Sequence, residues 1–221
     1  MTDKHRRFLG PVVEMRKLHD SAEQRIVHSA EMLDRKSLAS VGDTTGERLT
    51  ALLTETKAHT PEELAANVAR IGELLGRFAL YVPARFTDDP AEQAKYWAVR
   101  SGIFPAVGGS RPAGTTCLSE DVAFHIEDLP RATAELQALI ARHGYDACSY
   151  GHALEDNYHF IINQSFSPPA EVARYEALMN DVAELVSAGT TARSKPSMAR
   201  GATWRLSLIH ISEPTRLQLI S

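Results

Sequence analysis

Residues 149–166, SYGHALEDNYHFIINQSF, predict a strand, a turn and a second strand. The turn-like segment at 155–157 separates the strands, and the second strand contains the apolar run at 160–162. His152 and His159 stand on either side of this turn. They are either a ligand pair that a hairpin brings together or two polar side chains that flank a strand. Their spacing alone favours the flanking role.

The sequence on either side of this hairpin predicts helices and further strands. Thr60-Pro61-Glu62-Glu63 is a capping box with proline in the first helical position, and leucine, valine and isoleucine recur on one face of the helix that it opens. We expect helices at 10–33, from 60, from 89, from 128 to 143 and from 167 onward, strands at 49–56 and 122–126, and a loop at 40–48. This order predicts an α+β fold: a largely antiparallel sheet with helices packed on one face.

The composition is that of a globular chain and excludes several functions. Of the 221 residues, 43% are hydrophobic and 24% are charged, which is enough for one sizeable core. A net charge of -4 with a pI near 6.1 shows no excess of basic residues for binding nucleic acid or an anionic membrane. We find neither an apolar run of membrane-spanning length nor a signal peptide. Cys117 and Cys148 match no zinc or redox spacing, so we expect core-filling thiols in a reducing cytoplasm.

The sequence changes character after about residue 187. Residues 188–205 have no periodicity, and residues 206–221, LSLIHISEPTRLQLIS, resemble the translated read-through of a sequencing adapter. Back-translating from Ser187 and dropping the first two bases gives RRYDGSLEAEHGTGRNM, a coherent string. We therefore interpret residues 1–187 as the native domain, 188–205 as a frame-shifted segment and 206–221 as an adapter-derived tail that we expect to be disordered.

Three stretches, YWAVRSGIFPAVGGSRPAGTT (96–116), EDVAFHIEDLPRATAELQALIARHGYD (120–146) and GHALEDNYHFIINQSF (151–166), together resemble one family. They are similar to the C-terminal cap domain of FAD-linked oxidases that dehydrogenate D-2-hydroxy acids such as D-lactate and glycolate. The resemblance is greatest to large bacterial proteins that fuse an FAD domain, this cap and an iron–sulfur module. It implies an FAD-oxidase cap fold with ferredoxin-like elements.

The resemblance assigns roles to four residues. His152 and His159 match the two metal-binding histidines of the family's GHxxxGNxH motif, which are also catalytic, and Asn157 matches its asparagine, a cofactor-binding position. Arg100 matches an arginine that holds the substrate carboxylate. The chain departs from the motif at Asp156, where the family has glycine, and the EHGxG motif that completes the metal site is absent from the expressed frame.

The remaining polar residues of these stretches have patterns typical of structural roles. Arg111 could contact substrate or cofactor, but we expect it to have a role in its loop. We expect Glu120-Asp121 to lie at the entry to a strand rather than to form an acid pair. We expect His125 to be a structural residue within the strand at 122–126.

As a whole, the resemblance implies an inactive fragment of an FAD-dependent D-2-hydroxy-acid dehydrogenase. FAD would be held mainly by another domain, with a divalent metal such as zinc or manganese and, in the parent protein, an iron–sulfur cluster. The expected partner is a small 2-hydroxy acid, without nucleic acid and without a membrane span, in a cytoplasmic protein whose parent could sit at the periphery of the inner membrane. The alternative is a non-catalytic α+β ligand-binding or regulatory domain.

Resequencing the source DNA tests the frameshift. We expect EHGTG to return in frame downstream of residue 187 and an FAD domain to precede Met1. Stop codons in the alternative frame, or the absence of EHGTG from it, would contradict this interpretation.

Overall fold

The computed structural model describes residues 3–20, 25–42, 50–155 and 157–191. The elements run in the order α1 (Asp3–His19), β1 (Ser29–Leu33), α2 (Arg35–Ser40), β2 (Ala51–Glu55), α3 (Pro61–Leu75), α4 (Pro90–Gly109), β3 (Thr116–Ala123), α5 (Leu129–Arg142), β4 (Cys148–His152), β5 (Asn157–Gln164) and α6 (Pro169–Thr191). The expected turn residue Asp156, residues 43–48 of the expected loop and residue 49 of the expected strand lie outside the described residues. So do residues 192–205 of the expected frame-shifted segment and the predicted tail at 206–221.

The strands form one antiparallel sheet in the order β2-β1-β4-β5-β3. The hairpin of β4 and β5 lies at its centre, and Tyr150 pairs with His159 across it. On one side β1 pairs with β4, so that Glu31 lies opposite His152. On the other side β3 pairs with β5, so that Asp121 lies opposite His159. The predicted hairpin and the antiparallel α+β architecture are confirmed.

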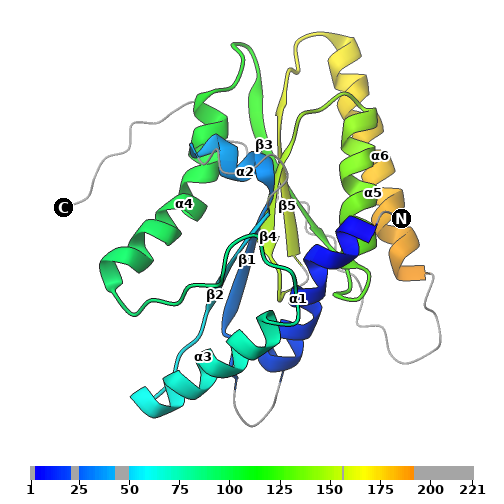
Figure 1. The fold of residues 1–221 in the computed structure, drawn as a ribbon. Coiled ribbons are helices and arrows are strands. Elements are labelled where there is room, and N and C mark those ends of the chain that lie inside the picture. Colours follow the sequence, from blue (N-terminus) through cyan, green and yellow to red (C-terminus); the bar gives the residue numbers. More distant parts are fainter. Residues whose placement is uncertain (1–2, 21–24, 43–49, 156, 192–221) are drawn as a thin grey trace.

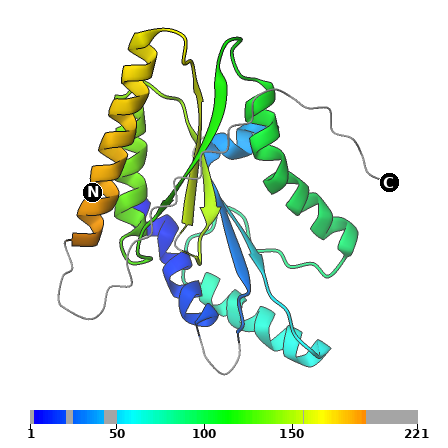
Figure 2. The same cartoon turned by 180° about the vertical axis from the view of Figure 1, so that it is seen from behind.

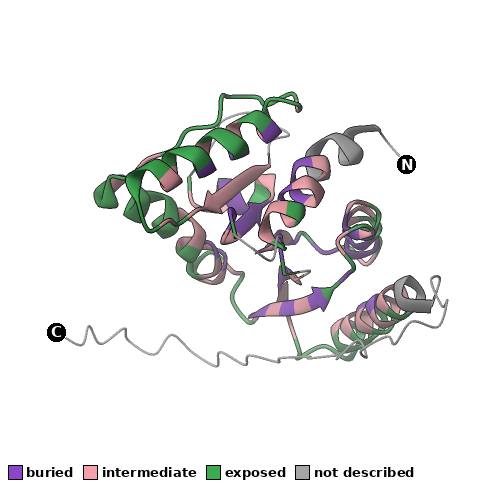
Figure 3. Cartoon of the chain, turned by 90° about the horizontal axis from the view of Figure 1, so that it is seen from below, coloured by how far each residue is buried: buried purple, intermediate pink, exposed green. Residues whose placement is uncertain are grey.

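Helices lie on both sides of the sheet (Figures 1 and 2). The larger core lies between one face and the helices α1, α3, α5 and α6; its least exposed large side chains include Met15, Ile71, Leu136, Tyr158, Phe160, Ile162 and Leu178. The other face carries a smaller apolar cluster with α2 and α4, formed by Leu33, Leu38, Ile103, Val107, Cys117, Tyr150 and Ile161. Figure 3 shows the buried residues gathered between the sheet and the helices. We expected helices on one face of the sheet, and four helices, α1, α3, α5 and α6, lie on one face. The other two, α2 and α4, lie on the opposite face.

Side-chain caps begin two of the predicted helices. The Thr60 hydroxyl accepts a hydrogen bond from the Glu63 amide at 3.1 Å, and the Glu63 carboxylate accepts from the His59 amide at 2.8 Å. Asp89 caps α4 by accepting from the Ala91 amide. Asp128 holds the N-cap position of α5, but its side chain makes no capping hydrogen bond.

The prediction of one helix over 10–33 is wrong in its second half. The helix ends at His19, and residues 29–33 form β1, followed by the short helix α2 that we did not predict. The segment SAEML consists largely of residues that favour helices, so local propensity indicates the wrong structure. Its pairing with both β2 and β4 overrides that propensity. Asp34 then caps α2 through the Ser37 amide at 2.7 Å and also accepts from the Ser149 amide of β4 at 3.0 Å.

The predicted strand at 122–126 is displaced along the chain. The strand β3 covers 116–123, so His125 lies beyond its end and is exposed. Our interpretation of His125 as a residue within a strand is therefore wrong. Arg111 fulfils the expected loop role by donating to the carbonyls of Gly108 and Thr115.

Two further expectations can be compared with the described part of the chain. Cys117 and Cys148 are free thiols, and Cys117 is buried, as we expected. Burial raises the pKa of the Cys148 thiol to about 12. No described helix combines the length and the apolar character that a membrane crossing requires.

Gly151 allows the two strands of the hairpin to approach closely. A Cβ atom built at this position would stand 2.4 Å from the Asn157 carbonyl oxygen and 2.8 Å from the Tyr158 Cα. Both atoms belong to the backbone of β5, so no side-chain rotation relieves the clash.

We expect Gly151→Ala to lower the free energy of unfolding by about 1–3 kcal/mol or more, because overpacking would force the strands apart. Denaturant unfolding measures this change. Gly72→Ala is the matched control, since a Cβ there meets nothing within 4 Å and alanine is favoured in a helix by roughly 0.5–1 kcal/mol. Equal effects of the two substitutions would contradict the close approach of the hairpin strands.

Candidate functional site

A set of polar side chains projects from the face of the sheet on which α2 and α4 lie, and we call this face the polar face. Successive side chains of a strand point to opposite faces, so residues two apart share a face. His152 and Tyr150 of β4 thus lie on the same face as His159 of β5. Glu31 of β1 and Asp121 of β3 join them across the ladder. The site is therefore built from four adjacent strands.

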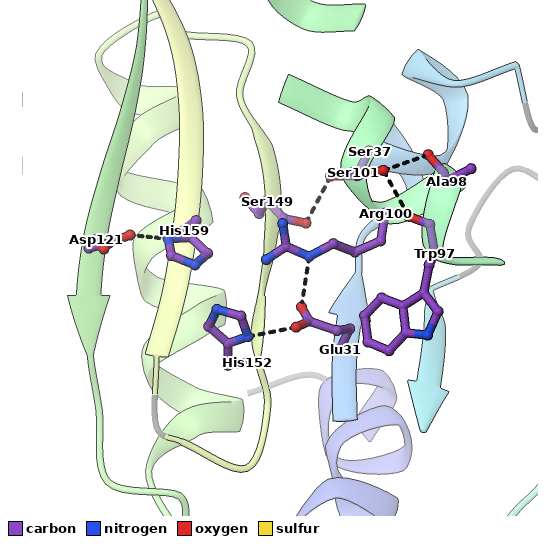
Figure 4. A network of polar contacts seen from close by, with 10 residues as sticks. All are labelled: Glu31, Ser37, Trp97, Ala98, Arg100, Ser101, Asp121, Ser149, His152 and His159. Atoms are coloured by element: carbon purple, nitrogen blue, oxygen red, sulfur yellow. Dashed lines mark hydrogen bonds and ion pairs between the residues drawn. The ribbon is translucent and has the colours of Figure 1, made fainter. Parts of the chain in front are cut away.

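Glu31 connects the sheet to helix α4 through both of its carboxylate oxygens (Figure 4). Oε1 lies 2.6 Å from Nδ1 of His152, and Oε2 accepts from Nε of Arg100 at 3.2 Å. The Glu31 side chain is only 5% exposed, whereas those of Arg100 and His152 are 24% and 38% exposed. A carboxylate buried to this extent requires charged or strong donors, and here it has one on each oxygen.

His159 has the same arrangement with a different carboxylate. Its Nδ1 contacts Oδ1 of Asp121, the residue directly opposite on β3. An ionised carboxylate only accepts hydrogen bonds, so Nδ1 of each of the two histidines carries the proton. When the rings are neutral, Nε2 then holds the lone pair that can bind a metal.

Ring contacts close these residues into one cluster. The rings of His152 and His159 meet edge to face with centroids 5.4 Å apart, and His159 lies 5.1 Å from the ring of Tyr150. The Arg100 guanidinium stands over the Tyr150 ring, 4.9 Å from its centroid. Arg100, Tyr150, the two histidines and Glu31 therefore form a continuous circuit of contacts.

The shared carboxylate alters the acid–base behaviour of its partners. The hydrogen bond to Glu31 raises the pKa of His152 above its ordinary value of 6.5, although burial acts in the opposite direction. Burial alone would raise the pKa of Glu31, but the hydrogen bond with His152 and the charge of Arg100 outweigh it and lower the pKa. Burial raises the pKa of the Tyr150 hydroxyl. At neutral pH the residue next to His152 is therefore a carboxylate.

The donor set fits part of a transition-metal site. Histidines that bind a metal through one ring nitrogen usually donate the other N–H to a carboxylate, as both histidines do here. Across the described residues, no group of three or more His, Cys, Asp or Glu side chains is arranged to hold a metal. Catalytic zinc sites typically have three protein ligands, so the two imidazoles would constitute an incomplete site.

The structure brings together three of the four predicted site residues directly. His152, His159 and Arg100 all belong to the circuit of contacts. Asn157 begins β5, two residues before His159, and its Oδ1 is buried without a hydrogen-bond partner among the described residues. Such an orphaned acceptor is compatible with a bound group, and its cofactor role stays a prediction.

Sequence reasoning missed Glu31, Tyr150 and Asp121. Glu31 was hidden in a segment predicted to be helical, and Asp121 was interpreted as the start of a strand. Residue types along TCLSEDVA (116–123) do not alternate regularly, so the sequence carries no signal for Asp121; only the strand geometry of β3 places Asp121 on the face opposite Glu120.

Comparison with known proteins places this geometry in context. The family model described as FAD linked oxidases, C-terminal domain, matches residues 15–190. Among solved structures, the chain is similar to 4-ethylphenol oxidase from Gulosibacter chungangensis in its isoeugenol complex, with 11% identity and a TM-score of 0.50. That similarity covers 86% of this chain and 42% of the oxidase chain, so the chain spans less than half of that protein. No curated protein matches the sequence.

We expect Glu31→Gln to lower the pKa of His152, because the neutral amide removes the partner that stabilises the protonated ring. A proton NMR titration of the imidazole measures the change. Asp121→Asn is the control, since it leaves the bond between Glu31 and His152 in place. A His152 pKa that does not move in Glu31→Gln would contradict the contribution of Glu31.

The same pair links stability to pH. The raised pKa of His152 stabilises the fold fully below 6.5, and this stabilisation is lost as the pH rises through the folded-state pKa. The lowered pKa of Glu31 contributes above its ordinary value of 4.5, and that contribution is lost as the pH falls through the folded-state pKa. The difference in unfolding free energy between wild type and Glu31→Gln should thus be largest between pH 4.5 and 6.5. Urea unfolding over this range checks the sign.

Proposed function

The chain belongs to the family of FAD-linked oxidase C-terminal domains, and from this premise we propose that it is the substrate- and metal-binding part of a flavin-dependent dehydrogenase of D-2-hydroxy acids. D-Lactate or glycolate would be oxidised to the corresponding 2-oxo acid. The observation that carries the proposal is the placement of both motif histidines and Arg100 on one face of the sheet, with each imidazole held through Nδ1.

The substrate class follows from the chemistry of these groups. A 2-hydroxy acid has a carboxylate and a neighbouring hydroxyl, which together can chelate a divalent ion. Arg100 uses Nε for Glu31, so the bond to Glu31 leaves its two terminal nitrogens to face a carboxylate. We assign the substrate carboxylate to Arg100 and the hydroxyl end to the side of the two histidines.

His152 and His159 would hold the divalent metal through Nε2. Glu31 and Asp121 accept the hydrogen bond from Nδ1–H, so in the neutral ring the lone pair is on Nε2, and they also orient each ring. Zinc or manganese suits neutral imidazole. Such an ion would supply Lewis-acid chemistry that lowers the pKa of the substrate hydroxyl, and FAD would supply a hydride acceptor. The Tyr150 ring lies beneath the Arg100 guanidinium, 4.9 Å from ring centroid to Cζ, and so restricts where the guanidinium can move when a carboxylate is bound.

The parent protein is part of the proposal as well. FAD would be held mainly by a domain that precedes this one, and an iron–sulfur module could carry the electrons onward. We propose a cytoplasmic location for the parent, with peripheral attachment to the inner membrane as an option. The Glu-His pair of the missing EHGxG motif would complete the metal site.

Titration calorimetry of the chain with D-lactate, with and without Zn²⁺ or Mn²⁺, tests the proposal. We expect D-lactate binding only in the presence of metal, and we expect His152→Ala to weaken metal binding by about tenfold or more, because even the outer-shell partners of a metal-binding histidine contribute 10–100-fold. His125→Ala removes an exposed histidine outside the cluster and serves as the control.

Two outcomes would contradict this proposal. Binding of D-lactate without metal that survives His152→Ala would favour a non-catalytic ligand-binding or regulatory domain. The absence of a group of three metal-binding side chains among the described residues agrees with that alternative. Oxidation of D-lactate by the chain alone, measured as bleaching of added FAD, would show that no further domain is required.

A further inference from the structure

Glu31 is the one acidic residue of the cluster that contacts both Arg100 and His152 among the described residues. We propose that Glu31 is a positioning residue that sets the Nδ1–H tautomer of His152 and, through the same carboxylate, the orientation of Arg100. This inference rests on the proposed function only where it assigns a metal to His152 and a substrate carboxylate to Arg100. The contacts of Glu31 with the two residues do not depend on that function.

The position of Glu31 follows from the sheet and not from a flexible loop. It lies in the middle of β1, which pairs with β2 through Leu53 and with β4 through His152. Its neighbours Ala30 and Met32 point into the larger core and are each 3% exposed. The backbone on both sides of Glu31 is therefore fixed, and its carboxylate reaches His152 and Arg100 from a rigid base.

A carboxylate is the only side-chain group of this length that satisfies both partners. It offers two acceptors, and both His152 Nδ1–H and Arg100 Nε–H are donors. A glutamine at this position would offer one carbonyl oxygen and one NH₂ group. The charged guanidinium would compete more strongly for the oxygen, which would turn the NH₂ group toward His152.

That rearrangement would reverse the tautomer of His152. With a donor facing it, Nδ1 would have to accept a hydrogen bond, and the proton would move to Nε2. Nε2 is the nitrogen that the proposed function assigns to the metal, so it would no longer offer a lone pair. Glu31→Gln would thus weaken metal binding because it places a proton on Nε2 of His152, and not because it changes the backbone or the position of the ring.

Asp121 provides the matched comparison. It holds Nδ1 of His159 in the same way, but among the described residues its carboxylate is not shared with Arg100. An asparagine there can still turn its carbonyl oxygen toward Nδ1–H, because no guanidinium competes for it. We therefore expect Asp121→Asn to preserve the tautomer of His159 while Glu31→Gln reverses that of His152.

Long-range proton–nitrogen NMR of the full chain, at a pH where the rings are neutral, reads the tautomers directly. We expect Nδ1–H for both histidines in the wild type, Nε2–H for His152 alone in Glu31→Gln, and Nδ1–H for both in Asp121→Asn. The double variant Glu31→Gln with Arg100→Met removes the competitor for the amide oxygen, so His152 should return to Nδ1–H. A purely structural role for Glu31 predicts no such rescue.

A Co²⁺ titration followed by the visible absorption of the ion is the second readout. We expect the affinity for Co²⁺ to fall by about 10–100-fold in Glu31→Gln and to recover in the double variant. If the wild type binds no Co²⁺ but the tautomer of His152 reverses and is rescued, the positioning role stands and the metal-binding function fails. If Co²⁺ binds but His152 keeps Nδ1–H in Glu31→Gln, the positioning role is overturned and the function stands. A wild-type His152 in the Nε2–H form overturns the positioning role whether or not the variants fold.

Discussion

The register of the central hairpin determines which side chains of this domain meet. Tyr150 lies opposite His159, and the same strand β4 places His152 opposite Glu31 on its other edge. A slip of β5 by one residue against β4 would turn His159 into the larger core and bring Tyr158 and Phe160 out onto the polar face. Those two aromatic residues are 1% and 0% exposed, so burial of their rings strongly disfavours the slip. The apolar side of β5 thereby fixes the position of its polar side.

Alternation also separates two acids that are adjacent in the sequence. Glu120 points into the larger core, is 1% exposed and accepts a hydrogen bond from the Tyr175 hydroxyl at 2.6 Å. Asp121 points the other way and holds His159. The first acid stabilises the packing of α6 on the sheet, and the second holds Nδ1 of His159 on the polar face. An acidic pair in the sequence therefore has one structural member and one member in the candidate site.

The elements with strong local signals could be predicted from the sequence. The capping box at Thr60, the apolar stripes of α3 and α5 and the hairpin at 149–166 all appear where we expected them. The strand β1 could not be predicted, because helix-forming residues fill a position that only its two neighbouring strands make extended. The misassignment of β1 concealed Glu31. Arg100 was assigned by resemblance, since a single arginine on a helix gives no signal of its own.

Helix α4 explains why a polar site can be held firmly at the edge of a small core. Arg100, Ile103 and Val107 follow one another at helical spacing and share one side of the helix. Ile103 is 0% and Val107 8% exposed in the smaller apolar cluster, whereas Arg100, one turn earlier, reaches Glu31. The packing of the apolar residues thus sets the distance at which the guanidinium meets the carboxylate. Because the core already orders the backbone on both sides, the ion pair orders little more than the Arg100 side chain itself. The side chains of the candidate site are therefore preorganised, because the packing of α4 and the pairing of β1 hold them in place before any ligand binds.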